Sequence, residues 1–536
     1  MTQATEDFDA VVVGAGFAGL YMLHKLRGLG LRCRLFEAGE GVGGAWYWNR
    51  YPGARCDSES YFYCYSFSDE ILQEWTWSEK FPAQPEIERY LNFAADRLGL
   101  RSDMRFNRRV TGASYDEASL RWTVETDAGD RVTTRYLVTA IGGLTATAAN
   151  LPAIPGIADF EGEWYHTGHW PKQGVDLAGK RVGVIGTGST GIQAIPEIAR
   201  QAAELTVFQR TPAYIMPARN APLDAEYVAG IKANYPEIWR KAKAHRGGQP
   251  YDPPTLAFAD VEESEARRLQ EEYWNNGGLR VVQLFNDVYS NPASREFTEN
   301  FFREKVRAIV RDPAKAEILE PKGYPLGAKR IALDTNYYET FNLPHVHVVD
   351  AKKNPIAKIT PTGIRAGDTD YPLDVIVFAT GYDAVTGPFR AMDISGRGGV
   401  RLADRLADGP RAYIGLAFAG FPNLLAVSGP CNPALSTNVP VSIEHDVEWI
   451  ADAIAYCEAN GITAIEPTEE AEEAWVEDTQ ARIRGSIFEQ ADSWQFGSNV
   501  PGKPRRFLLW LGGLTAFREK CAAVAEAGYE GFMLTR

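Results

Sequence analysis

Two short runs of apolar residues, each followed at once by a glycine-rich loop, form the clearest pattern in the sequence. They cover residues 8–13 and 181–185. A short, mostly apolar run of this kind predicts a buried strand of a parallel sheet, and glycines directly after it predict a tight turn into a helix. The sequence therefore predicts a strand–turn–helix unit in two separate places, with the first helix running through Leu29.

The residue that follows the second strand differs between the two units. In the first unit a strand over residues 31–36 ends at Glu37, and in the second a strand over 205–208 is followed by Gln209 and Arg210. In dinucleotide-binding folds an acid at this position binds the ribose hydroxyls, whereas a cation suits the 2′-phosphate of NADP. FAD therefore fits the first unit and NADP the second. The alternative is that Arg210 is only a solvated charge at the end of a strand.

The rest of the pattern predicts the domain organisation. Between residues 224 and 310 apolar side chains recur at helical spacing among many charges, which indicates an inserted helical subdomain, and strand signals resume over 328–381. The predicted fold class is α/β, with two Rossmann-like dinucleotide-binding domains for FAD and NADP. The predicted limits are 1–143 and 383–536 for the FAD-binding domain, 144–215 and 327–382 for the NADP-binding domain, and 216–326 for the helical subdomain.

Composition narrows the possible partners. A chain of 536 residues with 45% apolar content can build two or three cores. The formal net charge of −14, without any local run of Lys or Arg, disfavours nucleic acid and anionic membranes. The first seven residues have neither a basic stretch nor an apolar one, and no later segment is apolar enough to span a bilayer, so we expect a cytoplasmic protein, with a monomer as the default.

Cysteine and histidine spacing disfavours metal and dithiol chemistry. The six cysteines form no CxxC pair, and the seven histidines show no metal-ligand spacing. We therefore expect buried or idle thiols, no disulfide framework and no metal.

Residues 160–171 carry the most specific motif. They read Phe-Glu-Gly-Glu-Trp-Tyr-His-Thr-Gly-His-Trp-Pro and lie between the two glycine loops. This string resembles the fingerprint of the Baeyer–Villiger monooxygenases, flavoproteins that use NADPH and O2 to convert ketones to esters or lactones. Residues 43–57 resemble a second signature of that family. Residues 429–444 resemble the longer active-site loop of its phenylacetone and steroid branch.

The resemblance implies a reaction in which NADPH reduces FAD and O2 adds at flavin C4a, giving a peroxide that must stay anionic to attack the ketone. An anion in a partly dehydrated pocket needs a fixed cation, and Arg330 stands where the family has its essential arginine. Asp57 matches the carboxylate that orients this arginine. From the sequence alone, the two could equally form an ordinary interdomain salt bridge.

The two loops and the resemblance together imply a set of cofactor-binding residues. Lys329 matches a second cation at the 2′-phosphate and Trp494 a tryptophan that touches the nicotinamide nucleotide, while Trp46, Trp48 and Tyr63 are equally well explained as packing residues. The expected contacts are Gly14, Gly16, Ala18, Gly19, Glu37, Gly44, Ala45, Trp46, Tyr47, Trp48, Arg55, Cys56, Asp57, Tyr63, Val110, Gly186, Thr187, Gly188, Ser189, Thr190, Gly191, Gln193, Arg210, Thr211, Lys329 and Trp494.

Two further expectations concern motifs beside the reaction centre. His166 and Trp170 of the fingerprint are interpreted as structural or conformational, helping the NADP domain to move between poses. In the loop over 429–438, the small residues Cys431, Ala434 and Ser436 are expected to leave room for the ketone beside the flavin.

Three other functions are compatible with parts of this sequence. A flavin monooxygenase that oxygenates amines or sulfides shares both glycine loops, but its fingerprint usually ends in Tyr or Phe instead of Trp170-Pro171, and it lacks the Asp57 and Arg330 pair. A disulfide reductase is disfavoured because no CxxC is present. A flavin-dependent sensor without turnover would show no NADPH oxidation on addition of ketone. The sequence does not identify the ketone.

Overall fold

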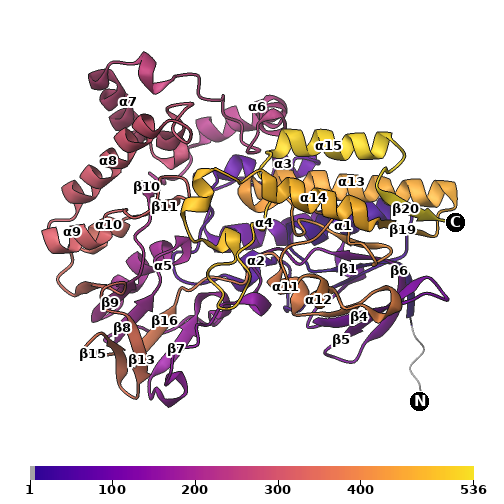
Figure 1. Cartoon of the computed structure of the whole chain (residues 1–536), viewed down its shortest axis with the longest axis horizontal. Coiled ribbons are helices and arrows are strands. Elements are labelled where there is room, and N and C mark those ends of the chain that lie inside the picture. The colour runs from indigo at the N-terminus through magenta and orange to yellow at the C-terminus, as the bar shows by residue number, and fades with distance from the viewer. Residues whose placement is uncertain (1–5) are drawn as a thin grey trace.

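The computed structural model describes residues 6–536, so most of the N-terminal stretch interpreted above as lacking a targeting signal lies outside the described residues. Two large sheets, three smaller ones and the surrounding helices make up the described part of the fold (Figure 1). In this view the first sheet lies at the right beneath α13, α14 and α15, and the second lies at the lower left. Helices α7 and α8 lie at the upper left, α9 lies below them, and α6 lies near the top centre.

The first sheet is assembled from both ends of the chain. Its order is β17-β4-β5-β6-β1-β2-β3, with β18 also pairing with β6. β1 runs parallel to β2 on one side and to β6 on the other, which places Val13 beside Phe36 and Thr139. The strands are β1 (Glu6–Val13), β2 (Cys33–Phe36), β3 (Met104–Arg105), β4 (Val110–Asp116), β5 (Arg121–Thr126), β6 (Arg131–Thr139), β17 (Asp393–Ser395) and β18 (Leu424–Ala426).

The second sheet is wholly parallel. Its order is β12-β9-β8-β16-β7, so β8 lies at its centre and the strand of the fingerprint, β7, lies at one edge. Its strands are β7 (Glu163–His166), β8 (Arg181–Ile185), β9 (Glu204–Gln209), β12 (Val346–Asp350) and β16 (Val375–Phe378). A three-stranded antiparallel sheet joins β12 to β16 and comprises β13 (Ile356–Thr360), β14 (Gly363–Ala366) and β15 (Thr369–Pro372).

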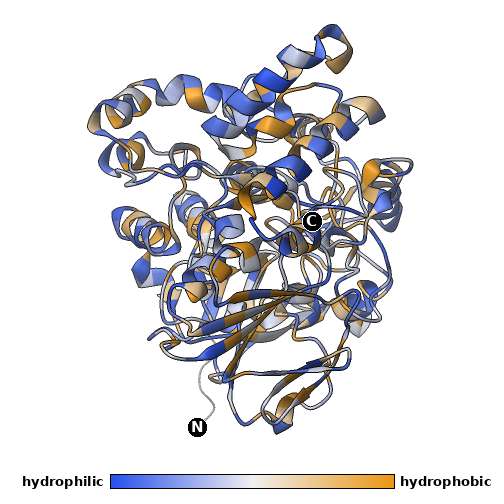
Figure 2. Ribbon diagram, turned by 90° about the vertical axis from the view of Figure 1, so that its left-hand side faces the viewer, coloured by the Kyte–Doolittle hydropathy of each residue, from blue (hydrophilic) through white to orange (hydrophobic). Residues whose placement is uncertain are grey.

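Helices α6 to α9 form an insertion in the chain between strands of the second sheet. They are entered through β10 (Ile215–Pro217) and left through β11 (Ala332–Asp334), and these two strands pair in parallel. The pairing closes the insertion at its base. Helices near the outer surface alternate between hydrophilic and hydrophobic residues, whereas strands in the lower half carry hydrophobic stretches (Figure 2). The four helices are α6 (Ala225–Ala244), α7 (Glu263–Asn276), α8 (Pro292–Ile309) and α9 (Pro313–Leu319).

The remaining helices and strands complete the fold. They are α1 (Phe17–Gly28), α2 (Ala45–Trp48), α3 (Asp69–Glu74), α4 (Gln84–Arg97), α5 (Ser189–Ala199), α10 (Tyr337–Thr340), α11 (Gly387–Arg390), α12 (Leu402–Arg405), α13 (Val439–Asn460), α14 (Glu469–Ala481), α15 (Leu514–Glu526), β19 (Ala464–Pro467) and β20 (Phe532–Thr535). Among them, α5 and α10 pack in the core of the second sheet. α5 follows β8 as α1 follows β1, so the strand–turn–helix unit occurs twice, as predicted.

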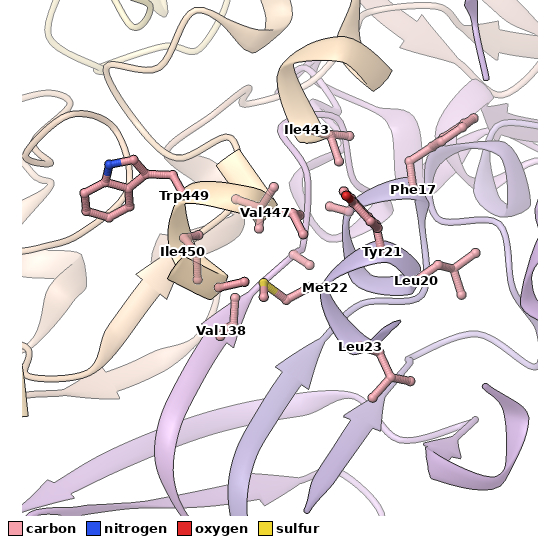
Figure 3. Packing of buried hydrophobic residues seen from close by; sticks show 14 of the residues in the cluster. Phe17, Leu20, Tyr21, Met22, Leu23, Val138, Ile443, Val447, Trp449 and Ile450 are labelled. Carbon is pink, nitrogen blue, oxygen red and sulfur yellow. The ribbon is translucent and has the colours of Figure 1, made fainter. Parts of the chain in front are cut away.

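The largest core joins the N-terminal unit to the C-terminal part of the chain. Tyr21 and Met22 of α1 face Val447 and Ile450 of α13, with Val138 of β6 below them (Figure 3). Met22, Val447 and Ile450 are fully buried. Burial of such side chains contributes roughly 1.5–3 kcal/mol each. This packing fixes α13, and the loop that precedes it, against the first glycine loop.

The structure confirms the predicted α/β class, and the predicted elements differ from the observed ones mainly at their ends. The strand expected over 31–36 begins only at Cys33, because the backbone N–H of Arg32 donates to the Asp9 carboxylate instead of joining a ladder. The helical region expected over 224–310 is interrupted by segments without α-helix over 245–262 and 277–291. Within residues 6–536, no helix combines the length and the apolar character needed to cross a bilayer.

A pair of glycines in α1 tests how closely this helix packs on the first strand. A Cβ atom at Gly19 would lie 1.8 Å from the carbonyl oxygen of Gly14, whereas one at Gly28 would meet nothing within 4 Å. We expect Gly19→Ala to force the helix away from the loop, at a cost of about 1–3 kcal/mol or more. Thermal melting and the FAD content of the purified protein measure both effects.

Gly28→Ala is the matched control in the same helix. Alanine favours helix over glycine by roughly 0.5–1 kcal/mol, so this variant should melt at the same temperature as the parent or slightly higher. Equal behaviour of the two variants would show that the contact between Gly19 and Gly14 does not hold the loop.

Candidate functional site

A single large cavity of about 1010 Å³ contacts both glycine loops. Gly14 and Gly16 line it at the end of β1, and Gly186 and Gly188 line it at the end of β8. In open α/β sheets, ligands bind at the carboxyl ends of the strands, and the cavity lies at those ends here. The volume is at the upper end of the range for sites that hold one small ligand, which suits a site for more than one.

On the side of the first sheet, glycines leave a cradle that a side chain would fill. Gly14 has φ +105°, and a Cβ atom at Gly44 would lie 2.7 Å from the Cα atom of Gly16. Glu37 is 4% exposed and accepts hydrogen bonds from the backbone N–H groups of Ala15 (2.8 Å) and Gly39 (2.7 Å). Burial raises the pKa of Glu37, and these two donors act in the opposite direction. A backbone cradle with a fixed acid beside it fits a dinucleotide without a 2′-phosphate.

On the side of the second sheet, two cations line the cavity. Arg210 follows the end of β9, and Lys329 lies in the loop before β11. The Lys329 Nζ atom lies 4.8 Å from the centre of the Tyr324 ring. Burial and the neighbouring charge of Arg210 lower the pKa of Lys329. Two cations placed so close together fit a doubly charged anion such as the 2′-phosphate of NADP.

Arg330 and Asp57 form an ion pair in the same cavity. The Nη2 and Nε atoms of Arg330 lie 2.6 and 3.1 Å from Oδ2 of Asp57, a residue 273 positions away in the chain. The arginine side chain is 41% exposed and the aspartate side chain 18%. The charge of Asp57 raises the pKa of Arg330. The site therefore holds a permanently charged, oriented cation with part of its surface free for a ligand.

A partly buried hydrogen-bond network ties the segment that carries Asp57 to α5 of the second unit. The Tyr51 hydroxyl donates to Oε1 of Gln193 at 2.7 Å, and Nε2 of Gln193 donates to the carbonyl oxygen of Arg55 at 3.0 Å. A Cβ atom at Gly53 would lie 2.3 Å from the carbonyl oxygen of Gln193. Gln193 thus links the two units directly and also lines the cavity.

The cavity brings together nearly all of the residues expected to bind cofactors. Those that line it are Gly14, Gly16, Ala18, Glu37, Gly44, Ala45, Trp46, Trp48, Arg55, Cys56, Asp57, Tyr63, Val110, Gly186, Thr187, Gly188, Ser189, Thr190, Gln193, Arg210, Thr211, Lys329, Arg330 and Trp494. Trp46 donates from its indole nitrogen to the Tyr63 hydroxyl at 3.2 Å, which fixes both aromatic groups at the wall.

Three expected contacts lie outside the cavity. Gly19 and Gly191 pack against the backbone of their own loops, where a Cβ atom would lie 1.8 and 2.2 Å from a carbonyl oxygen. Tyr47 is 6% exposed, packs on Gly39 and accepts a hydrogen bond from the backbone N–H of Glu40 at 2.9 Å. Its placement makes it a packing residue behind the wall.

The fingerprint motif also lies behind the wall. At the end of β7, Nδ1 of His166 accepts a hydrogen bond from the backbone N–H of Gly168 at 3.0 Å, and the ring stacks edge-on against Tyr382, 5.9 Å between centres. Trp170 is 5% exposed and packs in the core of the second sheet. Tyr382 in turn donates to Asn49 and lines the cavity. The motif therefore supports a cavity residue and does not face the ligand itself.

The expectation that Cys431, Ala434 and Ser436 make room for a ketone was wrong. Cys431 and Ala434 are buried, Ser436 faces solvent, and none of the three lines the cavity. The reason is the backbone, because Cys431 has φ +60° and its sulfur lies 3.7 Å from the carbonyl oxygen of Pro410. Leu435, Thr437, Val439 and Ile443 line the cavity instead. Leu435 lies in a single turn of 3-10 helix and Val439 opens α13, so no strand-like alternation in the sequence marks these residues.

Comparisons with known proteins agree with this geometry. Residues 8–234 match the family described as pyridine nucleotide-disulphide oxidoreductase. That match covers the two-nucleotide arrangement and not the disulfide chemistry, because all six cysteines here are buried and unpaired. A Baeyer–Villiger monooxygenase of Pseudooceanicola batsensis is 43% identical over 99% of this chain and 97% of its own length.

Two further proteins are similar over nearly the whole chain. A phenazine N-monooxygenase of Lysobacter antibioticus is 43% identical over 98% of this chain and 96% of its own length. A solved structure of an oxidised steroid monooxygenase bound to NADP is 49% identical, with a TM-score of 0.92 over 99% of this chain and 100% of that one.

The buried fingerprint histidine generates a prediction about stability in acid. Burial lowers the pKa of His166 to about 4, so folding favours the neutral ring. The resulting contribution to the free energy of unfolding is fully present above the ordinary histidine pKa of about 6.5. It is lost as the pH falls from there toward 4. His166→Asn keeps a hydrogen-bond acceptor for the N–H of Gly168 but does not titrate.

Melting temperature measured between pH 7.5 and pH 5 tests this. The parent protein should lose stability more steeply than His166→Asn below pH 6.5, by up to about 2 kcal/mol between pH 7.5 and pH 5. Parallel curves for the two proteins would mean that His166 is not held neutral by the fold.

Proposed function

Since this chain belongs to the Baeyer–Villiger monooxygenases, which insert one oxygen atom of O2 next to a ketone carbonyl, we propose that its reaction centre is the ion pair of Arg330 and Asp57. The observation that carries the proposal is the position of this pair. It lies in one continuous cavity with both glycine loops, and its cation is fixed while part of its surface stays free.

The chain uses FAD and NADPH, and the residues of the two sides of the cavity divide between them. The first glycine loop with Glu37 would hold FAD, and the second loop with Arg210 and Lys329 would hold NADPH. When bound, these cofactors supply the electrons that activate O2. The remaining work falls to the protein, which must orient the substrates, keep water away and stabilise the charge that develops on oxygen.

Arg330 is suited to that last task. A guanidinium keeps its charge in a partly dehydrated site, and a fixed cation aimed at a developing negative charge is among the largest contributions to catalysis. Asp57 holds Nε and Nη2 of Arg330 through one oxygen, so the guanidinium cannot rotate freely. Asp57 therefore acts on the arginine and not on the substrate.

The ketone would occupy the part of the cavity between Arg330 and the segment of Leu435, Thr437 and Val439. A mainly apolar wall suits an aliphatic, aryl or cyclic ketone. We further propose a monomer in the cytoplasm, with domain limits at 1–143 and 383–536 for FAD, 144–215 and 327–382 for NADP, and 216–326 for the helical insertion. The parallel pairing of β10 and β11 at the base of the insertion supports these limits.

N-oxygenation is a second candidate, supported by one observation. The relative named as a phenazine N-monooxygenase is 43% identical in sequence over 98% of this chain. A panel of ketones, aromatic nitrogen heterocycles and sulfides, scored by product mass and structure, separates the two. Ester or lactone formation supports the main proposal, and N-oxide as the sole product would replace it.

Removal of the Arg330 side chain tests the reaction centre. Arg330→Ala should still bind FAD, because the first glycine loop is untouched, and should still be reduced by NADPH. Ester formation should fall by about 10²–10³, as when one fixed electrostatic group is removed from an active site. Rapid-mixing absorbance at the flavin band reports reduction, and gas chromatography of the products reports the ester.

Arg365→Ala removes an arginine from an exposed ion pair with Asp370, outside the cavity, and serves as the control. It should leave both measurements unchanged. Ester formation by Arg330→Ala at the rate of the parent protein would show that Arg330 has been misassigned.

Coenzyme selection tests Arg210 and Lys329. A charge-assisted contact to phosphate contributes roughly 1.5–3 kcal/mol, so Arg210→Ala or Lys329→Ala should weaken NADPH binding by about one to two orders of magnitude. NADH, which lacks the 2′-phosphate, should be affected little. Titration of each coenzyme against the oxidised protein gives both dissociation constants.

Lys322→Ala is the matched control, since this exposed lysine precedes the same loop, donates to the carbonyl oxygen of Glu317 and does not line the cavity. Equal weakening of NADPH and NADH in Arg210→Ala would assign that residue a structural role.

A further inference from the structure

The loop before α13 adopts a backbone that its sequence does not favour. Ser428 and Cys431 have φ values of +57° and +60°, in the left-handed region where a Cβ atom is unfavourable. Such conformations persist only where the surroundings hold them in place. The loop leads directly to Leu435 and Thr437, which line the cavity.

A buried carboxylate of α13 holds this loop. Asp446 is 0% exposed, and its Oδ2 atom accepts hydrogen bonds from the backbone N–H of Ser428 at 2.9 Å and from Nδ2 of Asn432 at 3.1 Å. Its Oδ1 atom lies 3.3 Å from the same Nδ2 atom. The Asp446 side chain thus binds the loop at two points, at Ser428 near its start and at Asn432 near its middle.

Asn432 connects Asp446 to the turn that lines the cavity. It is 1% exposed, and its Oδ1 atom accepts a hydrogen bond from the backbone N–H of Ala434 at 2.9 Å. That N–H group opens the single turn of Ala434–Ser436, and Leu435 lies in this turn. A Cβ atom at Gly143, a neighbouring residue that also lines the cavity, would lie 2.5 Å from Cδ1 of Leu435. A small displacement of the turn would therefore change the space beside the ketone.

Asp446 itself does not line the cavity and contacts none of the residues assigned to the cofactors. We infer that Asp446 is a positioning residue that sets the shape of the ketone pocket through Asn432 and the turn of Ala434–Ser436. This inference rests on the proposed ketone site. Burial raises the pKa of Asp446 to about 7, and its donors from Ser428 and Asn432 act in the opposite direction, so these bonds favour the charged form.

The donor and acceptor atoms of this network determine which substitutions test the role of Asp446. In Asp446→Asn the new amide can accept from Ser428 only if its NH2 group faces Nδ2 of Asn432. If Asn432 then flips, its NH2 group faces the N–H of Ala434. One conflict between two donors remains in every arrangement.

Exchanging the two side chains removes the conflict. In the double variant Asp446→Asn with Asn432→Asp, the amide at 446 accepts from Ser428 and donates to the carboxylate at 432. That carboxylate still accepts from the N–H of Ala434. The exchange keeps one charge in place and forms three of the four parent bonds, because the bond from Nδ2 of Asn432 to Oδ2 of Asp446 has no counterpart. The double variant should therefore lie closer to the parent than Asp446→Asn does.

The experiment measures KM for a small methyl ketone, an aryl ketone and a large cyclic ketone, together with KM for NADPH. Asp446→Asn should raise KM for the ketones by roughly tenfold, and unequally among the three, with KM for NADPH unchanged. Amide hydrogen exchange should become faster over residues 428–437. The double variant should bring both measurements back toward the parent values. Unchanged ketone KM in Asp446→Asn, or a double variant whose ketone KM is no closer to that of the parent, would overturn the inference.

Glu86→Leu controls for a general loss of stability. Glu86 is 5% exposed, lies outside the cavity and accepts from the backbone N–H and hydroxyl of Ser78 at 2.8 and 2.9 Å. Its loss should lower the melting temperature while leaving ketone KM unchanged. If the parent protein oxygenates no ketone, the proposed function fails, whereas hydrogen exchange with the coenzyme-free protein still decides whether Asp446 and Asn432 hold the loop.

Discussion

An arginine that stays charged inside a ligand cavity is the constraint around which this molecule is arranged. Arg330 must be desolvated enough to act on a ligand and yet not so isolated that its charge becomes costly. Asp57 resolves this by accepting from Nε and Nη2 while leaving part of the guanidinium exposed. The pair therefore supplies a cation of fixed direction.

The fold serves to bring these two residues together from 273 positions apart. Asp57 follows the first nucleotide-binding unit, and Arg330 returns from the helical insertion just before β11. The partly buried hydrogen bonds of Gln193 with Tyr51 and Arg55 hold the first unit to α5 of the second. The packing of α1 on α13 then places the substrate loop on the same cavity. Cofactor, cation and pocket wall are thus fixed by three separate contacts between distant parts of the chain.

The sequence predicted the parts of this arrangement that depend on local pattern. The strand over 181–185 was located to the residue, and Glu37, Arg210 and Arg330 all line the cavity as expected. It could not predict where a side chain points when distant contacts decide the backbone. Cys431 turns away because Asp446 and Asn432 hold the loop at positive φ, and Tyr47 fills the space over Gly39 instead of facing the ligand.

In this arrangement Asp57 acts through Arg330. A double-mutant cycle on ester formation, with Asp57→Ala, Arg330→Ala and the two combined, tests it most directly. If Asp57 only orients the arginine, its loss should matter little once the arginine is gone, so the combined variant should form ester about as slowly as Arg330→Ala alone. Losses that multiply in the combined variant would show that the two residues act independently and would contradict the claim.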